Sequence, residues 1–288
     1  MIFGAAAPLG LLAPSLRRAG ARQILGLTHG HETWWARVPV ARQMLRRIGN
    51  GCDHLTAISA YTEHRIGSTL SPAARLRLRR LAPPVDTDRF RPSQFADDRR
   101  TVRCISVARL IAQKGLMTLL LAWRQVLDRA RPGEAPRELI IVGEGPQRPR
   151  LERTIRKLDL ADSVRLVGAV PRAQVFTHLQ QADVFALPVR TRLAGLNPEG
   201  LCLAALEAAA CGLPVIIGNS GGAPETVCDG SSGFVVPSDD HHLLAARLDQ
   251  LLDNPALARD MGNRGRSYVT QHFSSDVARA TLRTALDL

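Results

Sequence analysis

From residue 101 onward, short apolar runs alternate with longer amphipathic segments, and this alternation constrains the fold more than any other feature. The apolar runs TVRCISVAR, ELIIVG, SVRLVG, DVFALP and LPVIIGN have the length and composition of buried strands. Helical spacing is found in the segments between them, at 114–131, 146–160, 171–182 and 200–211. Repeated strand–helix alternation predicts a parallel sheet with helices on both faces, a doubly wound Rossmann-like domain.

A shorter alternation of the same kind occupies residues 1–84, with roughly three strands. The polar, proline-rich stretch PPVDTDRFRPSQFADDRR separates the two halves and is typical of a linker. We therefore expect two α/β domains that face a cleft, the place where open sheets of this class bind ligands. The expected boundaries are a partial N-terminal domain at 1–84, a linker at 85–100, a second Rossmann-like domain at 101–272 and a C-terminal helix at 273–288.

The net charge of +12 comes mostly from arginine, in pairs such as Arg17-Arg18 and Arg46-Arg47. A basic excess is typical of proteins that bind nucleic acid, an anionic membrane leaflet or phosphorylated substrates. It also arises when arginines lie on solvated helix faces. Aromatic residues make up only 4%, which argues against stacking platforms for single-stranded nucleic acid. We expect no nucleic-acid partner, and we keep an anionic membrane surface as a candidate partner.

Five cysteines form no CxxC pattern, which favours buried, reduced thiols in a cytoplasmic protein. The longest apolar run, GLCLAALEAAACGLPVIIG at 200–218, is interrupted by Glu207 and Pro214 and is not expected to span a membrane. The apolar opening of the chain has its arginines after the apolar part, the wrong order for a secretion signal.

Glu207 is the only charged residue within this apolar run. An unpaired buried carboxylate is costly, so Glu207 must have a partner. On a helical path Glu199 and Glu207 lie roughly 12 Å apart, whereas the carboxyl pair of a glycosidase lies about 5–9.5 Å apart. The spacing suits the two ends of an extended ligand, with a phosphate at the helix start and ribose hydroxyls at Glu207. The alternative is that Glu207 pairs with a core arginine.

Arg109 ends the first strand of the second half, and Lys114 follows at a helix start. Two cations at that position can neutralise a diphosphate without a metal; a solvated lysine and a salt-bridged arginine are the structural alternative. The glycines of VGEGP, at 143 and 145, are weak support for nucleotide binding because the third glycine of GxGxxG is missing.

Two short motifs resemble metal sites. His29-x-His31 follows an apolar strand, and a histidine there can contact a sugar hydroxyl, bind zinc or serve the fold. Asp86-x-Asp88 lies in the linker, where turn and capping roles are favoured. We expect no metal site.

Taken together, the motifs AR-x4-KG at 108–115, VGEGP, VRLVGAV, E-x7-E from Glu199 to Glu207 and GLPVIIGNSGGAPETVCDGSSGFVV resemble the family-4 retaining glycosyltransferases. The segments THGHE and NPEGL resemble those of the actinobacterial GDP-mannose-dependent phosphatidylinositol-monomannoside mannosyltransferases. The resemblance implies the two-domain GT-B fold, transfer of a hexose from a nucleotide sugar such as GDP-mannose to an inositol phospholipid or similar amphipathic glycan, and no metal. It also implies a cytoplasmic location, including the inner face of the cell membrane.

The resemblance assigns roles to individual residues. Glu207 would bind the ribose, and Glu199 would bind the hydroxyls of the donor sugar. Arg109 and Lys114 would bind the diphosphate. His29 would reach the donor sugar from the first domain. Further donor contacts are implied at Gly143, Val167, Gly168, Val170, Gly200, Leu201, Cys202 and Leu203. Retention would follow from front-face attack, with the leaving phosphate assisting removal of the acceptor proton.

Family members open with a strand and a glycine-rich loop that this chain lacks, so the resemblance implies an N-terminally truncated first domain. We expect nucleotide affinity to survive this loss better than transfer. Two further hypotheses stay open: a catalytically impaired nucleotide-sugar-binding chain, and a nucleotide-sugar epimerase or hydrolase on the same fold. A basic nucleic-acid binder rests on charge alone.

Overall fold

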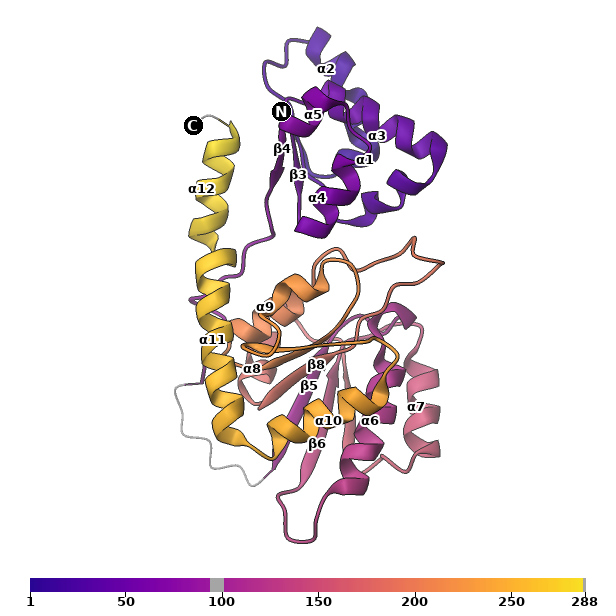
Figure 1. The fold of residues 1–288 in the computed structure, drawn as a ribbon, viewed down its shortest axis with the longest axis vertical. Helices are drawn as coiled ribbons and strands as arrows, with labels where there is room; N and C mark the ends of the chain where they lie inside the picture. Colours follow the sequence, from indigo (N-terminus) through magenta and orange to yellow (C-terminus); the bar gives the residue numbers. More distant parts are fainter. Residues whose placement is uncertain (94–100, 287–288) are drawn as a thin grey trace. The chain divides into compact units, whose positions relative to one another are not determined.

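The computed structural model describes residues 1–93 and 101–286, and the chain forms two compact units (Figure 1). Unit 1 comprises Met1–Pro84, Thr191–Leu201 and Ser275–Leu288, and unit 2 comprises Val85–Arg190 and Cys202–Ser274. Unit 1 thus gains a loop and a C-terminal segment that the sequence pattern does not connect to it. Residues 94–100 of the expected linker, and residues 287–288 of the expected C-terminal helix, lie outside the described residues.

Unit 2 contains a six-stranded parallel sheet in the order β10-β9-β8-β5-β6-β7. In chain order the strands are β5 (Val102–Val107), β6 (Arg137–Val142), β7 (Val164–Gly168), β8 (Val184–Leu187), β9 (Val215–Gly218) and β10 (Gly233–Val236). Numbered within the unit, this is the order 3-2-1-4-5-6 of a doubly wound sheet. The prediction of a Rossmann-like domain is confirmed, and the five predicted apolar runs form β5 to β9.

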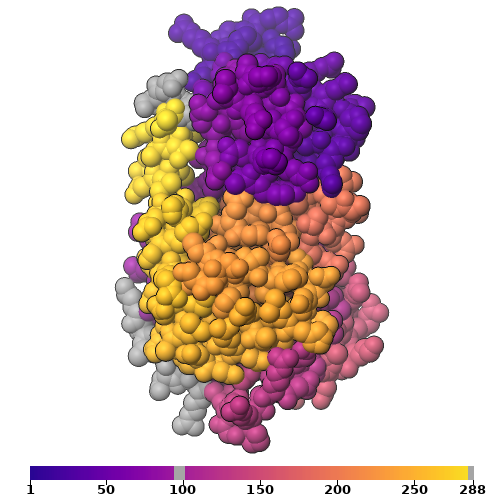
Figure 2. Space-filling view, viewed as in Figure 1, coloured from indigo at the N-terminus to yellow at the C-terminus, as the bar shows by residue number. Residues whose placement is uncertain are grey.

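The predicted helical segments of unit 2 also form helices, shorter by a few residues at each end. They are α6 (Leu116–Arg129), α7 (Arg148–Lys157), α8 (Arg172–Gln180) and α9 (Leu203–Ala210), followed by α10 (His241–Leu252) and α11 (Pro255–Phe273). The inner strands are mainly apolar because helices cover both faces, and β8 and β9 are completely buried. Figure 2 shows side chains of the orange and yellow segments closing over one face of this unit.

The sequence pattern did not predict β10. Its residues, GFVV, end the glycine-rich stretch NSGGAPETVCDGSSGFVV, whose composition is typical of a loop. The strand nevertheless pairs in parallel with β9 over four residues, and its apolar side chains Phe234 and Val236 are buried. The neighbouring glycines favour turns in a sequence-based prediction, whereas tertiary packing stabilises a strand here.

Unit 1 has a four-stranded parallel sheet in the order β1-β2-β3-β4, one strand more than the pattern indicated. The strands are very short: β1 (Ile2–Phe3), β2 (Leu25–Gly26), β3 (His54–Ala57) and β4 (Leu78–Arg80). The core beneath them is formed by aliphatic side chains, with Ile24, Leu45, Ile48 and Ile66 at 0% exposure. This packing, rather than strand length, holds the sheet together.

The helices of unit 1 follow the expected order but are more broken. They are α1 (Ala6–Leu9), α2 (Ala13–Arg18), α3 (Pro39–Gly51), α4 (Ala60–Gly67), α5 (Pro72–Leu76) and α12 (Ser275–Leu286), with 3-10 turns at Gly10–Leu12, His31–Thr33 and Trp35–Arg37. Hydroxyl groups start two of them, since Ser59 accepts the Thr62 amide and Ser71 accepts the Ala74 amide. None of the helices in residues 1–93 and 101–286 combines the length and the apolar composition that crossing a bilayer requires.

The described part of the expected linker is packed against unit 2. Phe90 is buried, and the Arg266 guanidinium on α11 donates to the carbonyl oxygens of Phe90 (3.0 Å) and Thr87 (3.4 Å). Asp86 accepts the Arg89 amide at 3.1 Å, which confirms the turn role that we favoured for this aspartate.

The five cysteines are free thiols. Burial raises the pKa of Cys52 to about 11 and that of Cys211 to about 12. The prediction of buried thiols is confirmed for Cys52, Cys104, Cys202 and Cys211, and it is wrong for the exposed Cys228, which lies in a turn.

Candidate functional site

The site in unit 2 begins where the strand order reverses, between β5 and β8. Strands on the two sides of this point connect in opposite directions, so their carboxyl ends leave space for a ligand. Arg109 lies two residues beyond the end of β5, and its exposed side chain makes no hydrogen bond or ion pair with any described residue. Lys114 ends the 3-10 turn Ala112–Lys114, five residues later. The two predicted cations therefore lie on the segment that leaves the ligand-binding edge of the sheet.

Gly115 fixes the position of that segment. Its φ is +68°, and a Cβ built on it would lie 1.9 Å from the carbonyl oxygen of Pro188, the residue after β8. Only glycine allows this approach. The glycine of the KG pair therefore packs the Lys114 turn against the end of β8.

The loops after β6 and β7 support the Arg109 segment. The Leu110 amide donates to the Glu144 carbonyl at 2.9 Å, and the Gly143 amide donates to the Gly168 carbonyl at 2.8 Å. The Gly143 amide is therefore hydrogen-bonded within the protein, and the VGEGP loop supports the segment that carries Arg109. Val167, Gly168 and Val170, three of the predicted donor contacts, are half-buried at and just beyond the end of β7.

The helix that carries Glu207 begins later than we predicted. Helix α9 starts at Leu203, with Cys202 at its N-cap, and no side chain caps it. Glu199 and Gly200 precede the helix, so our estimate of their spacing along a continuous helical path is wrong. The Ala205 amide donates to the Cys202 carbonyl at 3.1 Å, and the amides before it have no helical acceptor, as at any helix start.

Glu207 itself lies in the second turn of α9 with its side chain 10% exposed. Its Oε1 lies 3.3 Å from Nη2 of Arg172, the first residue of α8. Burial raises the pKa of Glu207, while the charges of Arg172 and Arg89 oppose that shift. The Arg172 side chain is 71% exposed, so the alternative of a pairing with a core arginine is wrong. Arg172 carried no signal in the sequence beyond being a basic residue at a predicted helix start.

The raised pKa of Glu207 predicts a specific pH dependence for the Glu207→Gln variant. The folded protein holds this proton more tightly than the unfolded chain, so this group's contribution to stability is largest below its ordinary pKa and is lost as the pH rises. Glutamine does not ionise, so its burial costs no additional stability as the pH rises. Denaturant unfolding from about pH 4 to about pH 7 should show the variant gaining stability relative to the parent chain. A difference that stays constant or shrinks over this range would contradict the assignment.

Unit 1 brings together the remaining predicted residues. A Cβ built on Gly30 would lie 2.7 Å from the Cα of Gly200, and one built on Gly200 would lie 3.2 Å from the His29 carbonyl oxygen. The two backbones are therefore in contact, and Glu199, Gly200 and Leu201 lie beside the His29 loop. Arg37 holds the same connection by donating to the Ala194 carbonyl at 3.1 Å.

The His29 loop is anchored from inside. Glu32 is completely buried, and its Oε2 accepts the His29 amide at 3.0 Å. The His29 ring bonds through Nε2 to the Gly4 carbonyl at 2.5 Å, so Nε2 donates and Nδ1 is the acceptor. Sequence reasoning gave Glu32 no role. Its burial identifies it as the residue that positions His29.

Comparison with known proteins places this geometry in a family. Residues 86–268 match the family described as glycosyl transferases group 1. A protein of Mycolicibacterium smegmatis is 45% identical over 94% of this chain and 72% of its own length, and its name is GDP-mannose-dependent alpha-(1-6)-phosphatidylinositol monomannoside mannosyltransferase. A Corynebacterium glutamicum protein, named as the corresponding enzyme for the monoacylated acceptor, is 40% identical over 96% of this chain and 72% of its own length.

Solved structures agree with the fold. The Anabaena protein HepE in complex with UDP superposes with a TM-score of 0.80 at 18% identity, covering 100% of this chain and 78% of that chain. Sucrose-phosphate synthase from Thermosynechococcus elongatus gives a TM-score of 0.79 at 24% identity, covering 96% and 70%. The two parallel-sheet units are those of the GT-B fold, as predicted. The chain belongs to the glycosyl transferases group 1 family.

Proposed function

We propose that this chain transfers mannose from GDP-mannose to phosphatidylinositol monomannoside or a closely similar amphipathic acceptor. The names of relatives at 40–45% identity support this substrate pair. The observation that carries the proposal is the buried Glu207 carboxylate, because its desolvation is offset only in part by an exposed arginine. A ribose would add two hydroxyl donors to such a carboxylate.

In this proposal, unit 2 binds the nucleotide. Glu207 accepts hydrogen bonds from the ribose, and Val167, Gly168 and Val170 lie against the base. The first-turn amides of α9, with Cys202 and Leu203, point positive dipoles at phosphate oxygens. Arg109 and Lys114 neutralise the diphosphate, and this needs no metal ion.

Unit 1 would contact the transferred sugar. His29 is exposed, and the bond from Nε2 to Gly4 leaves Nδ1 to accept from a sugar hydroxyl. Glu199 would accept hydrogen bonds from other hydroxyls of the same sugar. A lipid acceptor also requires the enzyme to reach a bilayer, so we propose peripheral association with an anionic leaflet on the cytoplasmic side. The basic residues of 1–84 support this location.

The test supplies GDP-mannose with radiolabelled mannose, together with phosphatidylinositol monomannoside in detergent micelles. We expect label in the lipid fraction, and no label when the acceptor is omitted. Calorimetric binding of GDP without label transfer would support the catalytically impaired alternative. Release of free mannose without acceptor would support the hydrolase alternative, and absence of both binding and transfer would contradict every form of the proposal.

A further inference from the structure

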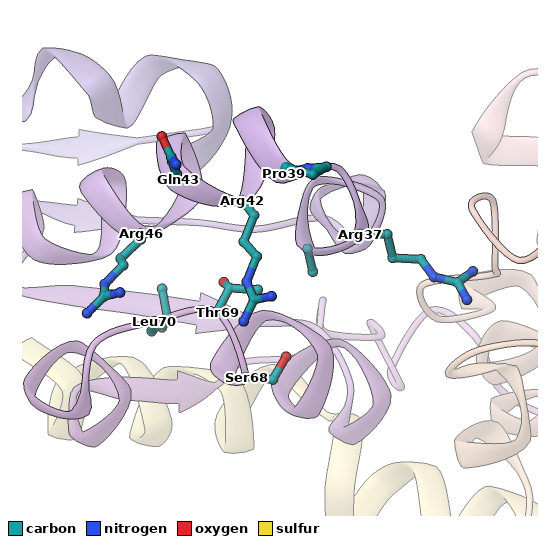
Figure 3. A pocket seen from close by; sticks show the side chains of 9 residues that line it. Arg37, Pro39, Arg42, Gln43, Arg46, Ser68, Thr69 and Leu70 are labelled. Atoms are coloured by element: carbon teal, nitrogen blue, oxygen red, sulfur yellow. The ribbon is translucent and has the colours of Figure 1, made fainter.

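A second candidate site lies entirely within unit 1, and none of its lining residues is among those proposed to bind the donor. It is a cavity of about 410 Å³ between α3 and the segment Ser68–Leu70 that follows α4. Its walls include Arg42, Gln43 and Arg46 from α3, and no Asp or Glu is among its lining residues. In Figure 3 the Arg42 side chain reaches towards Ser68 and Thr69, whereas Arg37 points away from them. We call this cavity the α3 pocket.

Arg42 and Arg46 lie one turn apart on the same face of α3. Like charges at this spacing destabilise a helix by about 0.2–0.5 kcal/mol. Neither side chain has a hydrogen bond or ion pair with any residue in the part of the chain that the structure describes. Some arginines on other helices do have an acidic partner one turn away, as in the pairs Arg124–Asp128 and Arg264–Asp260.

The surrounding sequence cannot supply the missing negative charge. Residues 1–84 contain twelve arginines and only three acidic residues. Asp53 pairs with Arg17 at 2.6 Å, Glu63 pairs with Arg80 at 2.7 Å, and Glu32 is completely buried beside His29. All three carboxylates are therefore occupied elsewhere. An anion for Arg42 and Arg46 has to come from outside the segment.

The opposite wall of the pocket has the reverse hydrogen-bonding character. The Ser68 hydroxyl donates to the Arg65 carbonyl at 2.8 Å, and the Thr69 hydroxyl donates to the Ile66 carbonyl at 2.8 Å. Because both protons are used, these oxygens offer only lone pairs to the pocket. A ligand that fits both walls has an anionic group for the arginines and hydroxyl donors for Ser68 and Thr69.

We propose that the α3 pocket binds a phosphorylated polyol, with its phosphate on Arg42 and Arg46 and its hydroxyls on Ser68 and Thr69. Arginine binds phosphate oxygens in a bidentate manner and with strong charge assistance. A second depression of about 490 Å³ shares Ser68 and Leu70 with the pocket and adds Arg75 and Leu76, the latter 78% exposed. The polyol phosphate is either free or the headgroup of a lipid, since both present the same chemistry.

The test compares two variants with equal loss of charge. The pocket variant is Arg42→Gln/Arg46→Gln, and the control is Arg22→Gln/Arg47→Gln, in which Arg47 lies on the same helix and neither residue lines the pocket. Inositol 1-phosphate and inorganic phosphate are titrated calorimetrically. Cosedimentation is measured with phosphatidylcholine vesicles that contain or lack phosphatidylinositol. GDP binding is measured in parallel, and it should be the same in all three proteins, which separates this proposal from the donor site.

We expect the pocket variant to lose roughly tenfold or more in affinity for inositol 1-phosphate, while the control variant keeps it. Weaker binding to phosphatidylinositol vesicles in the pocket variant alone would identify the lipid headgroup as the source. Unchanged vesicle binding with lost inositol phosphate binding would identify a free ligand. Equal losses in both variants, or inorganic phosphate binding as tightly as inositol phosphate, would overturn the proposal.

Discussion

Replacing Lys114 with alanine is expected to slow mannose transfer by roughly 10²–10³-fold while weakening GDP-mannose binding much less. The diphosphate gains negative charge as the bond to the sugar breaks, so a cation beside it stabilises the transition state more than the ground state. Lys114 ends a short turn fixed by the contact of Gly115 with Pro188, and this rigidity keeps the cation in place. Transfer rates at saturating donor and calorimetric affinities measure the two effects separately.

Lys157→Ala is the matched control. It removes the only other lysine of the chain, an exposed residue in the last turn of α7. This variant should transfer at the parental rate, because α7 lies outside the proposed donor contacts. Equal losses of rate and of donor affinity in Lys114→Ala would show that the lysine serves binding alone.

Replacing Glu207 with alanine is expected to weaken GDP binding by about 1.5–3 kcal/mol, roughly 10–150-fold in Kd. The carboxylate is buried, so its hydrogen bonds to a ribose compete little with water. Glu152→Ala is a suitable control, because Glu152 is a half-buried carboxylate of α7 that pairs with Arg148. An unchanged GDP affinity in Glu207→Ala, with normal unfolding curves, would contradict the site assignment.

The second unit was largely predictable, and the reason is physical. A buried parallel strand is apolar on both faces, so β8 and β9 appear in the sequence as uninterrupted apolar runs, and β5 and β6 as mainly apolar ones. β10 was concealed because its four residues lie among turn-forming glycines. The short strands of unit 1, such as β1, have two to four residues each and owe their pairing to the packing beneath them.

The candidate site was predictable where a residue conflicted with its surroundings. Glu207 was conspicuous as a charge in an apolar helix. Lys114 was conspicuous because the chain contains only two lysines. Arg172, the partner of Glu207, could not be predicted, because the two residues are 35 positions apart in the sequence and only the fold brings them together. The same holds for Glu32, whose burial beside His29 depends on the three-dimensional course of the loop. The α3 pocket brings Arg42 of α3 close to Ser68, which follows α4, and no spacing in the sequence connects the two residues.

The most direct test of the account is a thermodynamic cycle on the ribose. The parent chain and Glu207→Ala are each titrated with GDP and with the dideoxy analogue that lacks both ribose hydroxyls. If Glu207 holds the ribose, loss of the hydroxyls weakens binding to the parent by roughly 1.5–3 kcal/mol and leaves binding to the variant almost unchanged. Equal weakening in both proteins would mean that the ribose and Glu207 do not interact, and the central claim would be wrong.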